Sequence, residues 1–115
     1  MPIKDIGAEE LRALIKEKRE QMEIIDVRSQ DEYDVVHVKD SKLIPINEIQ
    51  ARAGEIDWNK EVVFLCLSGN RSKMAAMLVS MGRDVKNLQY GIYECYKDGK
   101  GENLVVDKDN IDKYF

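Results

Sequence analysis

The sequence predicts a single α/β domain built on a mostly parallel sheet, for two reasons. Short apolar runs rich in β-branched residues, Ile24–Val27 and Val62–Leu67, are typical of strands covered on both faces. Stretches with helical periodicity lie between such runs, and strands that alternate with helices form parallel sheets. Because 115 residues can bury one core of moderate size but not two, we expect one domain over residues 1–115.

Three further segments are candidate strands. Val85–Leu88 is a weaker apolar run, and Ile3–Ile6 and Leu43–Ile44 are short. The tail from Lys97 onward is polar and contains glycine, then closes with apolar residues. Its order is left open by the sequence.

Two helices are predicted early in the chain. Ala8–Arg19 carries leucine and isoleucine at helical spacing among charged residues, which is the pattern of an amphipathic helix. Ser29 and Glu32 have the spacing of a capping box, in which each side chain bonds to the backbone of the other residue. We therefore expect a short helix that follows Ser29 and continues to about Val35.

Two more helices are predicted further along. Asn47–Ala53 is a short candidate, and Ser72–Met81 is a longer one with Gly82 in the place of a C-cap glycine. On the longer helix we expect the apolar stripe to pack into the core; its methionines are Met74, Met77 and Met81.

The composition excludes several classes of protein. Hydrophobic residues make up 43% and charged residues 35%, as in an ordinary globular domain. The formal net charge of −4 gives no electrostatic footprint for nucleic acid or an anionic membrane. No apolar run approaches the ~20 residues that span a bilayer, and the N-terminus lacks the apolar core of a secretory signal. We expect a cytoplasmic protein with neither nucleic acid nor membrane as partner.

The candidate active site is the segment C-L-S-G-N-R-S after the most hydrophobic run. Cys66 is the last or nearly the last residue of the strand expected there, and ligands of open α/β sheets bind at the carboxyl ends of the strands. Gly69 and Asn70 tolerate positive φ, so the loop can turn N–H groups toward the sulfur. The helix that begins near Arg71 adds unsatisfied donors and its positive dipole end. Both effects favour an anion, so we predict that Cys66 is a nucleophile populated as thiolate.

The rest of the segment forms the predicted binding loop. Arg71 can close the ring around the sulfur or bind an anionic group of the substrate. A lone cysteine at a strand end is usually a small core residue, but a structural turn does not need both cysteine and arginine. We assign to the loop Leu67, Ser68, Gly69, Asn70, Arg71 and Ser72.

Four segments, in order, resemble the rhodanese-domain sulfurtransferase family. Cys66–Ser72 has the family pattern of cysteine, four residues, arginine and a small hydroxyl residue. Ile25–Tyr33 is similar to its D-V-R…E-[YF] segment, and His37–Pro45 to its G-H-I-x-G-A…I-P segment. Gly91 falls where the family has a glycine-rich turn before its last helix. The resemblance covers about residues 3–100 and leaves 101–115 as a C-terminal extension.

The resemblance implies a rhodanese-like, three-layer fold with a mostly parallel five-stranded sheet flanked by helices. It also implies sulfur transfer, in which Cys66 takes a sulfane sulfur from thiosulfate or a persulfide and passes it to cyanide or a thiol. No metal or organic cofactor is required. The partners are then a small-molecule or protein persulfide donor and a thiol acceptor, and we expect a monomer.

Three residues outside the loop have candidate roles. Asp26 and Arg28 are interpreted as structural support, because an Arg–carboxylate pair near a strand end can fix the surrounding loops. Cys95 is either a packing residue or a resolving thiol that attacks a Cys66 persulfide.

Two other functions stay open. Cysteine-based phosphatases and arsenate reductases of the related fold place five residues between cysteine and arginine, whereas four intervene here. The shorter ring suits one sulfur atom better than a tetrahedral oxyanion. The second alternative is a non-enzymatic module that carries sulfur or binds a partner. Leu67 stands where many family members have a basic residue, so thiosulfate is expected to be a poorer donor than a persulfide.

Overall fold

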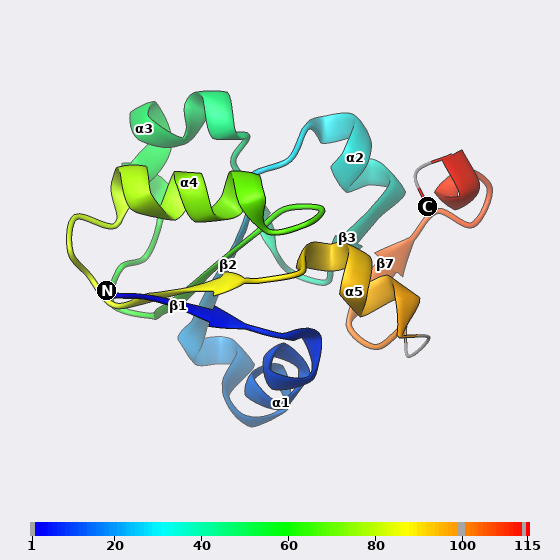
Figure 1. Ribbon diagram of the computed structural model, residues 1–115, viewed down its shortest axis with the longest axis horizontal. Helices are drawn as coiled ribbons and strands as arrows, with labels where there is room; N and C mark the ends of the chain where they lie inside the picture. The colour runs from blue at the N-terminus through cyan, green and yellow to red at the C-terminus, as the bar shows by residue number, and fades with distance from the viewer. Residues whose placement is uncertain (1, 99–100, 114) are drawn as a thin grey trace.

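The computed structural model describes residues 2–98, 101–113 and 115 and confirms the α/β fold (Figure 1). The main sheet has five strands in the order β1-β6-β5-β2-β4, and every adjacent pair is parallel. All five predicted strands are present, with bounds that differ from the predicted ones by at most two residues. They are β1 (Ile3–Ile6), β2 (Met22–Asp26), β4 (Lys42–Leu43), β5 (Glu61–Leu65) and β6 (Val85–Leu88).

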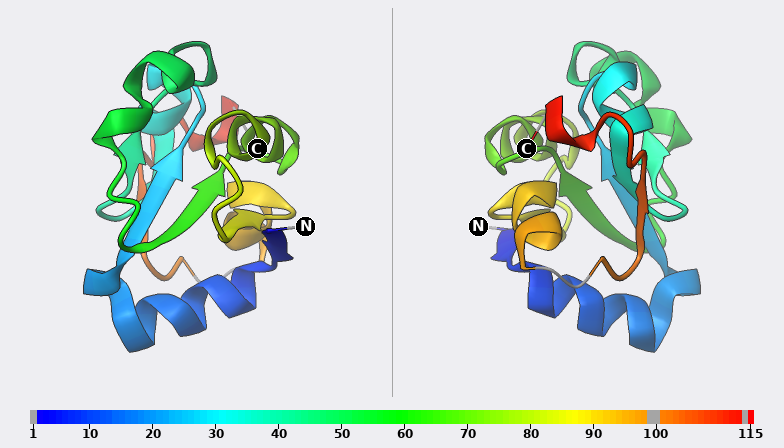
Figure 2. Two further views of the ribbon diagram at one scale, coloured as in Figure 1. Left: turned by 90° about the vertical axis from the view of Figure 1, so that its left-hand side faces the viewer. Right: turned by 90° about the vertical axis from the view of Figure 1, so that its right-hand side faces the viewer.

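The sheet is buried because helices cover both of its faces (Figures 1 and 2). One face packs against α3 (Ile49–Arg52) and α4 (Asn70–Val79), and the other against α1 (Ala8–Lys18) and α5 (Gly91–Lys97). Side chains of β5 alternate between the two resulting cores, as the pleat of a strand requires. This explains why its sequence is a continuous apolar run.

The predicted helices are present with revised bounds. The short helix α2 (Gln30–Val35) begins with the predicted capping box of Ser29 and Glu32. The predicted helix over 47–53 is broken, because 3₁₀ turns precede and follow the single turn of α3. Helix α4 begins and ends two residues before its predicted bounds, at Asn70 and Val79.

The methionine stripe of α4 faces solvent, so the prediction that it packs in the core was wrong. Met74 and Met77 are 58% and 61% exposed, whereas Ala75 and Ala76 on the opposite side of α4 are fully buried. Met81 lies two residues beyond the end of α4 and is 82% exposed. Helix α4 lies close enough to the sheet that small side chains fill the contact. Spacing alone identified an apolar stripe but could not show which side of the helix faces the sheet.

The C-terminal segment packs on the body of the domain. Strand β7 (Leu104–Val106) pairs antiparallel with β3 (Val36–Val38), and together they form a separate two-stranded sheet. Ile111 is buried in the same core as α1 and α5, and the ring of Phe115 lies 4.9 Å from that of Tyr96. This segment therefore shares the hydrophobic core of the preceding residues.

Candidate active site

Cys66 lies one residue beyond β5, at the carboxyl edge of the sheet and on the side covered by α4. Its side chain is nearly enclosed, with the residue only 1% exposed. The sulfur accepts a hydrogen bond from the backbone N–H of Gly69 at 3.1 Å and another from that of Ser72 at 3.4 Å. Two donors from the loop and the first turn of α4 thus converge on a single sulfur atom, as the sequence predicted.

The tight loop depends on Gly69. This residue has φ of +100°, in the left-handed region that favours glycine. A Cβ atom there would stand 2.0 Å from the carbonyl oxygen of Gln89. Asn70, which could also have adopted positive φ, is instead the first residue of α4. One left-handed residue is enough to turn the chain from the strand into the helix.

A buried polar network behind the loop fixes the two donors. The Ser72 hydroxyl donates to the side-chain oxygen of Asn87 at 2.6 Å, and the Asn87 amide donates to the Gly69 carbonyl at 3.3 Å. The same amide donates to a carboxylate oxygen of Asp5 at 3.0 Å. Asn87 is 1% exposed and therefore has few alternative partners in solvent. Sequence reasoning missed it, although a polar residue within the apolar run Val85–Leu88 was a usable signal.

Helix α5 begins directly against the loop. The N–H of Ile92 donates to the Cys66 carbonyl at 2.9 Å, and that of Tyr93 donates to the Leu67 carbonyl at 3.1 Å. Gly91 permits this approach with φ of +68°. Backbone N–H groups in the first turn of α5 therefore stabilise the backbone of the loop by hydrogen bonds.

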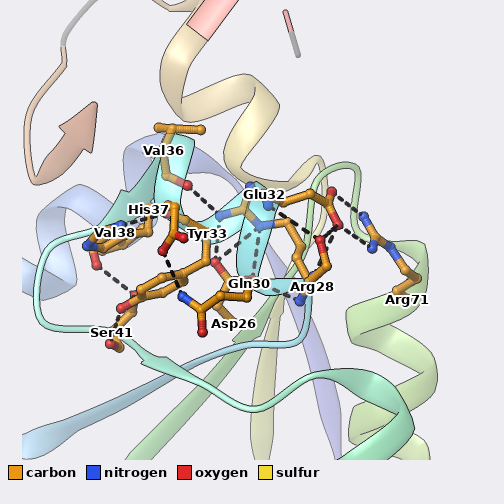
Figure 3. Close-up of polar contacts among 12 residues, drawn as sticks. Asp26, Arg28, Gln30, Glu32, Tyr33, Val36, His37, Val38, Ser41 and Arg71 are labelled. Carbon is orange, nitrogen blue, oxygen red and sulfur yellow. Dashed lines mark hydrogen bonds and ion pairs between the residues drawn. The ribbon is translucent and has the colours of Figure 1, made fainter. Parts of the chain in front are cut away.

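Arg71 lies against Glu32 of α2 rather than around the sulfur (Figure 3). Its two terminal nitrogens donate to the two carboxylate oxygens of Glu32 at 2.9 and 3.0 Å. The hydrogen bonds from Arg71, together with one from the Ser29 backbone, lower the pKa of Glu32 to about 2, although partial burial opposes this. Sequence reasoning assigned Glu32 only to the capping box, because nothing local links it to Arg71.

Asp26 and Arg28 form a buried ion pair beside this contact (Figure 3). The guanidinium donates through Nε and Nη2 to both carboxylate oxygens, at 2.9 and 2.7 Å. Nη2 also donates to the carbonyl of Val36 at the start of β3. The pair thus connects the end of β2 to the second sheet.

The remaining loop residues have different environments. Leu67 is half-buried and packs against the core on the α5 side, while Ser68 and Asn70 are exposed. Leu67 therefore contributes packing and no charge near the sulfur.

Cys95 is placed as a packing residue. It is buried on α5, in the core on the opposite face of the sheet from Cys66, and both cysteines are free thiols. Burial raises the pKa of Cys95 to about 12. A resolving thiol needs access to Cys66 and a populated thiolate, and this position offers neither.

The described part of the chain has neither a metal-binding cluster nor a membrane-spanning helix. Residues 2–98, 101–113 and 115 contain no group of three or more His, Cys, Asp or Glu side chains that could hold a metal ion. Among the helices of those same residues, none has the length and apolar character needed to cross a bilayer.

A comparison with known protein families matches residues 7–98 to the Rhodanese-like domain. This chain belongs to the rhodanese-like domain family. The sequence is 42% identical over 57 residues to a protein of Bacillus subtilis (strain 168) named "Putative sulfur carrier protein YrkF". That match covers 50% of this chain but only 31% of YrkF.

Solved structures share the fold. The rhodanese-related protein of Thermoplasma volcanium is similar with a TM-score of 0.78 and 26% identity, over 90% of this chain and 99% of that one. Ygr203w, described as a yeast protein tyrosine phosphatase of the rhodanese family, gives a TM-score of 0.70 at 19% identity, over 96% and 98% of the two chains. The second likeness shows the fold alone and carries no information on the chemistry at the site.

Proposed function

We propose that the protein is a sulfurtransferase that carries a sulfane sulfur on Cys66. The observation that carries this proposal is the small cradle in which the Gly69 and Ser72 N–H groups lie 3.1 and 3.4 Å from the sulfur. Four residues separate Cys66 from Arg71, one fewer than in the related phosphatase loops, which supports a loop sized for one sulfur atom. The family includes sulfurtransferases, and the name of the relative YrkF describes a sulfur carrier.

In the first step, the Cys66 thiolate attacks the outer sulfur of the donor. A new sulfur–sulfur bond forms, the donor's own sulfur–sulfur bond breaks, and the donor leaves with the electron pair. Thiosulfate leaves as sulfite, and a persulfide leaves as a thiolate. The outer sulfur of the resulting Cys66 persulfide is anionic, and the N–H groups of the loop and of the first turn of α4 stabilise it.

In the second step, an acceptor thiolate attacks the outer sulfur of the Cys66 persulfide. The bond to Cys66 breaks, Cys66 leaves as a thiolate, and the acceptor departs as a persulfide. Cyanide is the small-molecule acceptor that gives thiocyanate. Dividing the transfer into two displacements allows the donor and the acceptor to use the same small site in turn.

Intact-mass measurement tests this proposal. After incubation with thiosulfate or glutathione persulfide, we expect an adduct of one sulfur atom that maps to Cys66 and is discharged by cyanide. The adduct should be absent in Cys66→Ser and retained in Cys95→Ser, the matched control that removes the other thiol. A wild-type protein that acquires no sulfur on Cys66 from either donor would reject the proposal.

Two other results would identify the alternatives. Hydrolysis of a phosphotyrosine analogue without sulfur loading would indicate phosphatase chemistry on this fold. Loading from a persulfide without transfer to free thiols or cyanide would indicate a carrier that serves a dedicated partner protein.

A further inference from the structure

Each cation that the described part of the chain places beside the candidate loop is paired with a carboxylate. Among the described residues, the three ion pairs that contact the loop or the adjoining strand end join Arg28 to Asp26, Arg71 to Glu32 and Lys73 to Asp5. Leu67 adds no charge. The described residues around the site therefore supply three positive and three negative groups in matched pairs, of which the Arg28–Asp26 pair is buried.

The Arg71–Glu32 pair is the one nearest to the chemistry. Arg71 directly precedes Ser72, whose N–H donates to the Cys66 sulfur. Its pairing with Glu32 is bidentate, the geometry in which Arg and a carboxylate interact most strongly. The Glu32 side chain is 18% exposed and that of Arg71 is 41% exposed, so solvent only partly screens the pair.

This pairing changes what Arg71 offers to a substrate. A donor with two negative charges gains from a free guanidinium, but a guanidinium that already faces a carboxylate presents almost no net charge. A dianion must either displace Glu32 or bind beside it, and both cost free energy. For a donor with one negative charge, or none, the pairing of Arg71 with Glu32 costs much less binding free energy.

We propose that Glu32 is a specificity-determining residue that disfavours dianionic sulfur donors such as thiosulfate relative to persulfides with less charge at the transferred end. This inference rests on the proposed sulfurtransferase function. It assigns Glu32 a second role beside the capping box, because one carboxylate both caps α2 and neutralises Arg71.

A charge-sensitive alkylation assay tests the electrostatic part without sulfur transfer. The rate at which Cys66 reacts with anionic iodoacetate is divided by its rate with neutral iodoacetamide. In Glu32→Gln we expect this ratio to rise about threefold, the size of effect typical of a partly exposed ion pair. Gln also completes a capping box, so α2 retains its N-terminus. Asp31→Asn is the matched control, since it removes the same charge from an exposed neighbour on α2 and should leave the ratio unchanged.

The salt dependence of the same rate ratio in the wild-type protein is a second test, and it needs no variant. If Glu32 neutralises Arg71, the wild-type ratio should change little between low and high salt, because screening acts on net charge. A free guanidinium would instead make the ratio fall steeply as salt is added. That result, or equal ratios in wild type and Glu32→Gln, would overturn the inference.

The sulfur-loading assay completes the test. The KM for thiosulfate should fall about threefold or more in Glu32→Gln, while the KM for the persulfide of 2-mercaptoethanol, which carries at most one negative charge, changes less. Loading that proceeds normally in wild type but shows no such shift in Glu32→Gln rejects this inference alone. Absence of loading from every donor in wild type rejects the proposed function instead.

Discussion

Gly91 lies against the backbone of Leu67: a Cβ atom at position 91 would stand 2.0 Å from the Leu67 carbonyl oxygen. This contact lets the first N–H groups of α5 reach the carbonyls of Cys66 and Leu67. The glycine therefore supports the loop from the side opposite to α4. The clash that a side chain would make with the Leu67 backbone explains why a glycine stands at this position, where the family has its glycine-rich turn.

Gly91→Ala should destabilise the domain and displace the loop. The added methyl group meets backbone, which cannot rotate away, and φ of +68° is unfavourable for alanine. We expect a loss of at least about 2 kcal/mol in the free energy of unfolding, measured by urea denaturation. Gly54→Ala is the control, because a Cβ atom at Gly54 meets nothing within 4 Å. Equal stability of the two variants would contradict this account of the contact.

Asn87→Ala should weaken both the fold and the cradle. Inside the protein, the substitution removes one acceptor of the Ser72 hydroxyl, which keeps only the Gly69 carbonyl at 3.2 Å, and it removes a donor to that carbonyl. We expect a loss of about 1–3 kcal/mol of stability, since buried polar groups lose their partners. Alkylation of Cys66 by iodoacetamide at neutral pH should also slow by about threefold or more, because the two N–H groups are held less firmly.

Ser80→Ala provides the comparison for Asn87→Ala. Ser80 is a buried polar residue at the far end of α4, away from Cys66. Removal of the Ser80 hydroxyl should leave the rate of Cys66 alkylation by iodoacetamide unchanged. If Asn87→Ala also reacts at the wild-type rate, Asn87 contributes to stability but does not position the donors.

Substitutions on α4 should distinguish its two sides. Met77 is 61% exposed, so Met77→Ala should cost no more than about 0.5 kcal/mol. Val79 is buried in the core on the α4 side, so Val79→Ala should cost about 2 kcal/mol. Thermal or urea unfolding measures both. A large loss for Met77→Ala would restore the prediction that the methionine stripe packs in the core.

The Glu32–Arg71 pair should add an acid-sensitive contribution to stability. The pKa of Glu32 is about 2 in the folded protein, below its ordinary value of 4.5. A lowered pKa means that the stabilisation is complete above the ordinary value and is lost as the pH falls toward 2. We expect about 1–2 kcal/mol, reduced from the full linkage value because solvent partly screens the pair.

Urea unfolding between pH 7 and pH 2 measures this contribution. Glu32→Gln should flatten the decline in stability between about pH 5 and pH 2. If the variant shows the same acid dependence as wild type, Glu32 gains no stabilisation from Arg71.

The sequence determined those features that depend on neighbouring residues. The capping box needs only Ser29 and Glu32 at a spacing of three, and an apolar run is a strand whatever surrounds it. The loop follows the same logic, because Cys66 receives its donors from Gly69 and Ser72, a few residues away. Local geometry was enough to predict the fold class and the cradle.

Only the tertiary structure decided which distant groups meet. Glu32 and Arg71 are 39 residues apart, and Asp5 and Asn87 are 82 apart, so no spacing rule connects them. The side of α4 that faces the sheet is set by how closely the helix packs, which left Met77 exposed. These contacts depend on how strands and helices are brought together, and they determine the charge balance around Cys66.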